Sequence, residues 1–116
     1  MGDVSRMAYD EELAGRIREV VQEQQGVTEK RMFGGLAFLI DNNMAVCADS
    51  LGGLLLRVDP AQSESLLTEP GARRCEMRGR EMDGWLRIDA EAVETDDALR
   101  CWVSRGIARV QLLPPK

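Results

Sequence analysis

Three cysteines, a few adjacent acids and thirteen arginines are the side chains of this 116-residue sequence that could carry chemistry. Cys47, Cys75 and Cys101 are far apart, and an odd count without close spacing fits neither a disulfide framework nor a zinc site. Free cysteines are usually buried and inert. A nucleophilic thiol needs a neighbouring base or cation to lower its pKa, and the sequence has no histidine for that role.

The absence of histidine also excludes Ser-His-Asp and Cys-His catalysis and most zinc sites. Two acid pairs, Glu11-Glu12 and Asp96-Asp97, stand where helices are expected to begin. Acids at that position stabilise the positive end of the helix dipole, so we interpret them as structural. We therefore expect a protein that is not an enzyme and that has no cofactor and no metal.

The arginines gather in a predicted hairpin and in the last predicted helix, and together they form a candidate anion or nucleic-acid patch. They are Arg73, Arg74, Arg78, Arg80 and Arg87 in the hairpin, and Arg100, Arg105 and Arg109 in the helix. Arginine binds carboxylate and phosphate in a bidentate manner. However, acids alternate with the hairpin arginines, the net charge is −5, and few aromatic residues could stack on bases. A solvated, internally paired face is the simpler interpretation.

A paired glycine within "RMFGGLAFLIDNNMAV" (31–46) raises the question of a phosphate-binding loop. Such a loop needs a helix directly after its glycines, whereas Gly34-Gly35 is followed by a strand-like run. A bulge or a close approach of two backbones is the better interpretation. A strand edge opened by glycines could also pair with a second chain, and nearby exposed aromatic residues favour a protein contact. The candidate protein interface is Met32, Phe33, Gly34, Gly35 and Trp85.

Hydrophobic periodicity predicts the elements that hold these residues. Helices are expected over 9–25, 60–68 and from about 96 to the prolines at 114–115. Strands are expected over 32–40, 44–48, 54–58, 74–78 and 85–88, with a short turn at 41–43. The order α-β-β-β-α-β-β-α predicts an α+β two-layer sandwich, in which helices cover one face of an antiparallel five-stranded sheet.

The last helix shows the clearest pattern in the chain. Thr95 or Asp96 is expected to cap it. Its buried stripe is predicted to contain Leu99, Trp102, Val103, Gly106, Ile107 and Val110.

The length fits one domain over 1–116, with an ordered core of about 8–113. The longest apolar runs fall far short of the ~20 residues of a membrane helix, so we expect no membrane partner. The N-terminus has no basic segment followed by an apolar one, so we expect no signal peptide and a cytoplasmic location.

Four stretches resemble one known family: 31–46, "LLLRV" (54–58), "GREMDGWLRID" (79–89) and "CWVSRGIARVQLLPPK" (101–116). Together they closely resemble the N-terminal domain of the TfoX/Sxy family of bacterial competence regulators, over nearly the whole chain. The resemblance implies a small α+β domain linked to competence and transcription, and it implies no catalytic residues. Full-length members carry a second, C-terminal helical domain that we do not expect here, so the competence role cannot simply be transferred.

Three functions remain open at this point. We favour a non-enzymatic protein-interaction module, expected to self-associate or to bind a protein partner, in or near transcriptional regulation. The second is direct nucleic-acid binding through the arginine hairpin and last helix, which would weaken steeply with salt. The third is a small-molecule site between the helix layer and the sheet.

Overall fold

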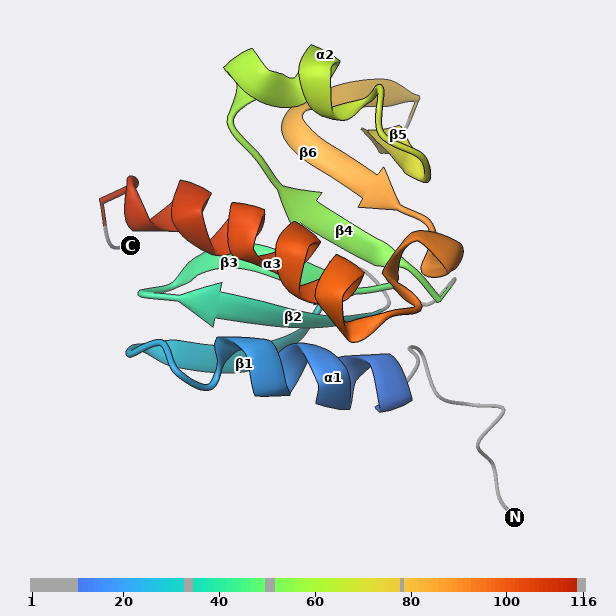
Figure 1. The fold of residues 1–116 in the computed structure, drawn as a ribbon. Helices are drawn as coiled ribbons and strands as arrows, with labels where there is room; N and C mark the ends of the chain where they lie inside the picture. The colour runs from blue at the N-terminus through green and yellow to red at the C-terminus, as the bar shows by residue number, and fades with distance from the viewer. Residues whose placement is uncertain (1–10, 33–34, 50–51, 78, 115–116) are drawn as a thin grey trace.

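The computed structural model describes residues 11–32, 35–49, 52–77 and 79–114 (Figure 1). Its helices are α1 (Glu11–Val21), α2 (Ser63–Leu66) and α3 (Asp96–Gln111), with 3-10 turns η2 (Pro60–Gln62) and η3 (Ala90–Val93). Its strands are β1 (Val27–Met32), β2 (Gly35–Ile40), β3 (Asn43–Ala48), β4 (Leu54–Arg57), β5 (Ala72–Met77) and β6 (Arg80–Ile88).

The strands form one antiparallel sheet in the order β1-β2-β3-β4-β6-β5. Helices α1 and α3 lie side by side over one face of this sheet (Figure 1). The predicted α+β two-layer sandwich is therefore confirmed. The predicted number of strands was wrong, because the sheet has six strands rather than five.

The additional strand is β1, which precedes the single strand predicted over 32–40 and overlaps it only at Met32; the predicted strand itself corresponds to β2, which begins at Gly35. It pairs antiparallel with β2, with Val27 opposite Ile40 and Met32 opposite Gly35. Its sequence, "VTEKRM", carries three consecutive charged residues and is mostly exposed. Charged side chains are typical of edge strands, where they oppose further strand pairing, but they conceal the apolar pattern that sequence analysis relies on.

The predicted turn between the next two strands is confirmed. Asp41 and Asn42 have φ angles of 53° and 69°, and Ile40 lies opposite Asn43. Two consecutive left-handed residues in a two-residue loop form a type I′ hairpin, which aspartate and asparagine tolerate well. Asn43 then enters the strand with its side chain buried, and its Nδ2 donates a hydrogen bond to the carbonyl of Pro114 at 2.9 Å.

Helix α3 has the buried stripe that its sequence predicts, since Leu99, Trp102, Val103, Gly106, Ile107 and Val110 are all buried. Its cap is Thr95, whose Oγ1 accepts a hydrogen bond from the Ala98 N–H at 3.1 Å. Gly106 lies over the sheet where Ala45 forms a bulge in β3, and a Cβ added there would be 2.7 Å from the Ala45 carbonyl oxygen. The glycine therefore allows the helix to approach the sheet backbone closely.

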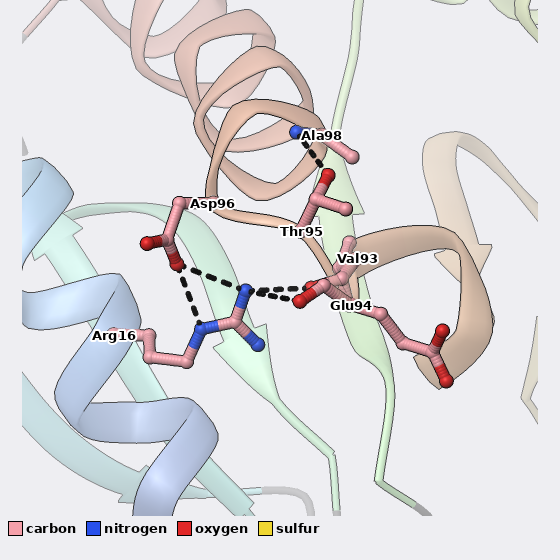
Figure 2. A network of polar contacts seen from close by, with 6 residues as sticks. All are labelled: Arg16, Val93, Glu94, Thr95, Asp96 and Ala98. Atoms are coloured by element: carbon pink, nitrogen blue, oxygen red, sulfur yellow. Dashed lines mark hydrogen bonds and ion pairs between the residues drawn. The ribbon is translucent and has the colours of Figure 1, made fainter.

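Arg16 joins α1 to the start of α3 (Figure 2). Its Nη2 donates to the carbonyls of Val93 at 2.9 Å and Glu94 at 3.1 Å, and its guanidinium also contacts Asp96 Oδ1 at 3.3 Å. Because these acceptors lie in the segment that leads into α3, one side chain fixes the relative position of the two helices.

The second helix is shorter than predicted. Asp59 Oδ1 accepts a hydrogen bond from the Ala61 N–H at 2.9 Å, and Pro60 begins a 3-10 turn that leads into α2. Leu66 and Leu67 are partly buried and pack against the same core as α1 and α3.

Candidate functional site: the open face of the sheet

The face of the sheet opposite α1 and α3 is also apolar, and we call it the open face. Its buried cluster consists of Ala37, Met44, Cys47, Leu55 and Cys75, with Leu39, Met82 and Trp85 packed against it and partly exposed. Every member belongs to a strand, whereas the described helix residues with apolar burial pack into the core on the other face. The open face thus presents apolar side chains that no described helix covers.

A bend in β6 brings two of these side chains to the cluster. Arg74 pairs with Leu86 and Glu76 pairs with Glu81, so residues 82–85 of β6 stand opposite the single residue Cys75. Gly84, with a φ of 83°, lies in this bulge, and β6 curves strongly in Figure 1. Bulges bend a strand and redirect its side chains. This one places Met82 and Trp85 beside the apolar cluster.

Trp85 and Arg57 together form a positively charged corner of the open face. Its ring lies under the Arg57 guanidinium, with 5.0 Å from Arg57 Cζ to the ring centroid, and the two residues are cross-strand partners. Burial lowers the pKa of Arg57 from its ordinary value, and the charge of Arg109 lowers it further. An arginine over an indole ring keeps an aromatic surface next to a positive charge, a combination common at protein interfaces.

Of the other predicted interface residues, Gly35 begins β2 and is buried. A Cβ added there would be 2.0 Å from the Ala48 carbonyl oxygen, so the glycine permits a close approach of two backbones. Met32 pairs with it, whereas Phe33 and Gly34 lie outside the described residues. Strands β3 and β4 separate Gly35 from Trp85, so three strand spacings alone put them at least roughly 14 Å apart.

The predicted arginine patch is divided between different surfaces. Arg73 and Arg87 are cross-strand neighbours on the open face. Arg74 points to the opposite face, because it pairs with Leu86 of the core. Arg100, Arg105 and Arg109 lie on α3, Arg80 is exposed at the start of β6, and Arg78 lies outside the described residues.

Four of these arginines form ion pairs, in line with the interpretation of internal pairing. Arg73 pairs with Asp89 at 3.0 Å and Arg105 pairs with Glu69 at 3.0 Å. The other two pairs are Arg74 with Glu64 and Arg87 with Asp49. Because Asp49 is buried beside the open face, its pair with Arg87 anchors a charge at the margin of the apolar cluster.

Cations outnumber acids around the cluster. Lys30 lies opposite Ala37 on β1, so its side chain projects from the open face. With Arg57, Arg73 and Arg87 it gives four cations, against three acids among the described residues: Asp49, Asp89, and Glu91, which lines a hollow together with Arg73 and Arg87. The whole chain has a net charge of −5. The open face is therefore a locally cationic surface on an acidic protein.

The thiols of the cluster are poor nucleophiles. Burial, and then the charge of Asp49, raises the pKa of Cys47 from its ordinary value of 9.0 to about 11. Burial also raises the pKa of Cys75, although Arg87 opposes that shift. Both thiols are buried, while Cys101 is exposed on α3. These thiols pack as small apolar groups.

Metal binding and membrane crossing are two further possibilities for the described part of the chain. Its Cys, Asp and Glu residues include no group of three or more that could hold a metal ion. No helix formed by the described residues has the length and apolar character needed to cross a membrane.

Sequence reasoning missed the second apolar face, which contains Leu39, Met44 and Leu55, because it expected helices to cover one apolar face of the sheet. The structure instead places Cys75 and Leu86 in apolar clusters on opposite faces. The uninterrupted apolar runs "LAFLI", "MAVCA" and "LLL" do carry a signal. Strands that are apolar on both faces read as continuous runs rather than alternating ones.

A sequence profile of the TfoX N-terminal domain matches residues 19–110 of the 116-residue chain. The chain belongs to the TfoX N-terminal domain family. Searches among curated proteins and among solved structures found no match. The match confirms the resemblance seen in the sequence, and membership of this TfoX family indicates a module of the kind found in competence and transcription regulators.

Proposed function

We propose that this TfoX N-terminal domain is a non-enzymatic docking module in transcriptional regulation, and that its open face binds an acidic amphipathic segment of a partner protein. The observation that carries the proposal is an apolar cluster on a helix-free sheet face, bordered by more cations than acids, in a chain of net charge −5.

The apolar centre supplies the contact surface. Leu39, Met82 and Trp85 pack against the cluster but stay partly exposed, so a partner could bury what remains of them. Protein interfaces typically have such a core, rich in aromatic residues and methionine, inside a polar rim. Truncating a central tryptophan or arginine often removes most of the binding free energy.

The charges favour an acidic partner over a second copy of the same face. Lys30, Arg57 and Arg73 would repel an identical open face, whereas they complement carboxylates on a partner. Arg73 and Arg87 already have acidic neighbours, so Lys30 and Arg57 are the rim cations that a partner would engage most. Self-association through this face is accordingly an alternative outcome of the test.

The direct test is titration of the full chain with a synthetic amphipathic peptide whose polar positions are glutamate, compared with the same peptide carrying lysine. We expect binding of the acidic peptide alone, weakened by salt because exposed charges are screened. Trp85→Ala and Arg57→Glu should each weaken binding by about tenfold or more, because tryptophan and arginine are the residue types that most often dominate a binding free energy. Arg100→Glu is the matched control, because Arg100 is exposed on α3.

Equal binding of both peptides, or binding that Arg57→Glu leaves unchanged, would contradict the proposal. Sedimentation velocity tests the remaining alternative, which is self-association through the open face. A dimer that Trp85→Ala dissociates would replace the acidic partner by a second copy of the chain.

A further inference from the structure

A cavity on the helix side of the molecule is not explained by the docking module. Its volume is about 190 Å³, and it lies between the last turns of α3 and the segment that connects β4 to α2. Its apolar wall consists of Val58 and Leu66 on one side and Ala108 and Leu112 on the other. Leu112 is 77% exposed, the one large apolar side chain so exposed in the described chain, and it lies at the rim of the cavity.

The polar end of the cavity is formed by two arginines of α3. Arg105 is held in place by its ion pair with Glu69 at 3.0 Å and by stacking 4.4 Å from the centroid of the Trp102 ring. Arg109 also lines the cavity, and its Nε is shielded from solvent without a hydrogen-bond acceptor among the described residues. A buried donor without an acceptor calls for an explanation, since nearly all such groups are paired.

The surroundings of Arg109 are electropositive. Its charge is close enough to Arg57 to lower the pKa of that residue, in addition to the larger effect of burial. Asp59 is the acid that lines the cavity, and its Oδ1 already accepts a hydrogen bond from the Ala61 N–H. An anion in the cavity would face the Arg109 guanidinium through its Nη groups, and it would reduce the repulsion between Arg109 and Arg57.

We propose that this cavity binds a small carboxylate with a short apolar tail, with the carboxylate against Arg109 and the tail between Val58, Leu66 and Leu112. The size supports a ligand of this class, because a cavity of about 150 Å³ is enough to hold benzene. Benzoate or hexanoate is somewhat larger than benzene and fits the 190 Å³. The site shares no lining residue with the apolar cluster of the open face, so it stands independently of the docking function.

The test is a two-dimensional NMR titration of the full chain with four probes: benzoate, hexanoate, hexanol and inorganic phosphate. We expect both carboxylates to shift the amide signals of residues 58–66 and 105–112, with dissociation constants on the order of 1 mM for ligands of this size. Hexanol lacks the charge and phosphate lacks the tail, so each should bind at least about tenfold more weakly. Arg109→Leu should abolish carboxylate binding, and Arg100→Leu, the same change outside the cavity, should leave it intact.

Three outcomes would overturn the inference. Hexanol that binds as tightly as the carboxylates would show that the negative charge has no role in binding. Signals that shift only on the open face would place the site elsewhere, and this result is obtained with the unaltered protein. Finally, saturating carboxylate that shifts no signal at all would show that the cavity does not bind this class of ligand.

Discussion

The two faces of the sheet are both apolar, but they are apolar in different ways. The helix face carries large, fully buried side chains such as Phe38, Leu54 and Leu56, and α3 lies close to the backbone beneath it. The open face has small buried groups such as Ala37, Cys47 and Cys75, its large side chains Leu39, Met82 and Trp85 stay partly exposed, and cations lie at its margin. The difference teaches that an apolar sheet face is not necessarily part of the folding core. Partial exposure of the large side chains and neighbouring charge distinguish the contact surface from the core.

The sharpest test uses two neighbours on β4 that face opposite ways. Leu56 is fully buried on the helix face, and Leu55 is 5% exposed on the open face. Leu56→Ala should lower the free energy of unfolding by about 2–5 kcal/mol, because packed neighbours cannot fill the cavity. Leu55→Ala should cost only about 1–2 kcal/mol, because water and mobile rim side chains can reach the vacated space.

Urea unfolding of both variants measures this difference, with the denaturant slope checked for a common unfolded state. Equal losses would break the comparison, since they would mean that the open face is packed as tightly as the core.

The second prediction concerns the closeness of α3 to the sheet. Gly106→Ala places a Cβ 2.7 Å from the Ala45 carbonyl oxygen and 2.9 Å from Leu56 Cδ1. Since the helix must move away, we expect a loss of about 1–3 kcal/mol, despite the better helix propensity of alanine. Gly15→Ala in α1 is the matched control, because an added Cβ there meets nothing within 4 Å. It should stabilise the protein by up to about 1 kcal/mol.

Thermal or urea unfolding of the two variants measures both the expected loss of stability for Gly106→Ala and the expected gain for Gly15→Ala. If Gly106→Ala were as stable as Gly15→Ala, α3 could move away from the sheet without loss of stability, which would contradict the close packing described here.

The third prediction uses the thiol of Cys47 on the open face. Its pKa is raised from 9.0 to about 11 in the folded protein, so folding favours the protonated thiol. The stability that this provides is complete below pH 9 and is lost as the pH rises toward 11. At pH 10 the loss should be about 1.4 kcal/mol relative to neutral pH.

Cys47→Ala supplies the reference, because its packing cost does not depend on pH. The difference in the free energy of unfolding between the unaltered protein and Cys47→Ala should therefore shrink between pH 8 and 10. A constant difference would show that Cys47 is accessible to water when ionised.

The sequence was sufficient for the fold class and for most of the helix face. The stripe of α3 could be predicted because every third or fourth residue is apolar, and the turn at Asp41 because its residues tolerate a left-handed backbone. The sequence was not sufficient for β1, whose charges Glu29, Lys30 and Arg31 conceal an edge strand. An edge strand pairs through its backbone with one neighbouring strand only. Its exposed, charged side chains have no apolar pattern from which this pairing could be predicted.

The candidate site was predicted only in part. Trp85 was predicted as an interface residue and lies on the open face, but its neighbour Arg57 was not predicted, because the two meet through pairing between β4 and β6. The arginine patch was inferred from proximity along the chain, yet strand alternation directs Arg73 and Arg74 to opposite faces. Such cross-strand relations depend on register, which a single sequence specifies weakly when both faces are apolar.

The pairing of β4 with β6, rather than with the next strand β5, also has a kinetic consequence. The meander from β1 to β4 joins near neighbours such as Ile40 and Asn43, so its contacts close short loops. Joining Leu54 to Ile88 encloses α2 and the β5–β6 hairpin within a much longer loop, which costs more chain entropy. Contacts of high sequence separation slow folding. The pairing of β4 with β6 also places Arg57 beside Trp85. We expect this pairing to form last in the sheet, so the open face is completed only when folding is nearly finished.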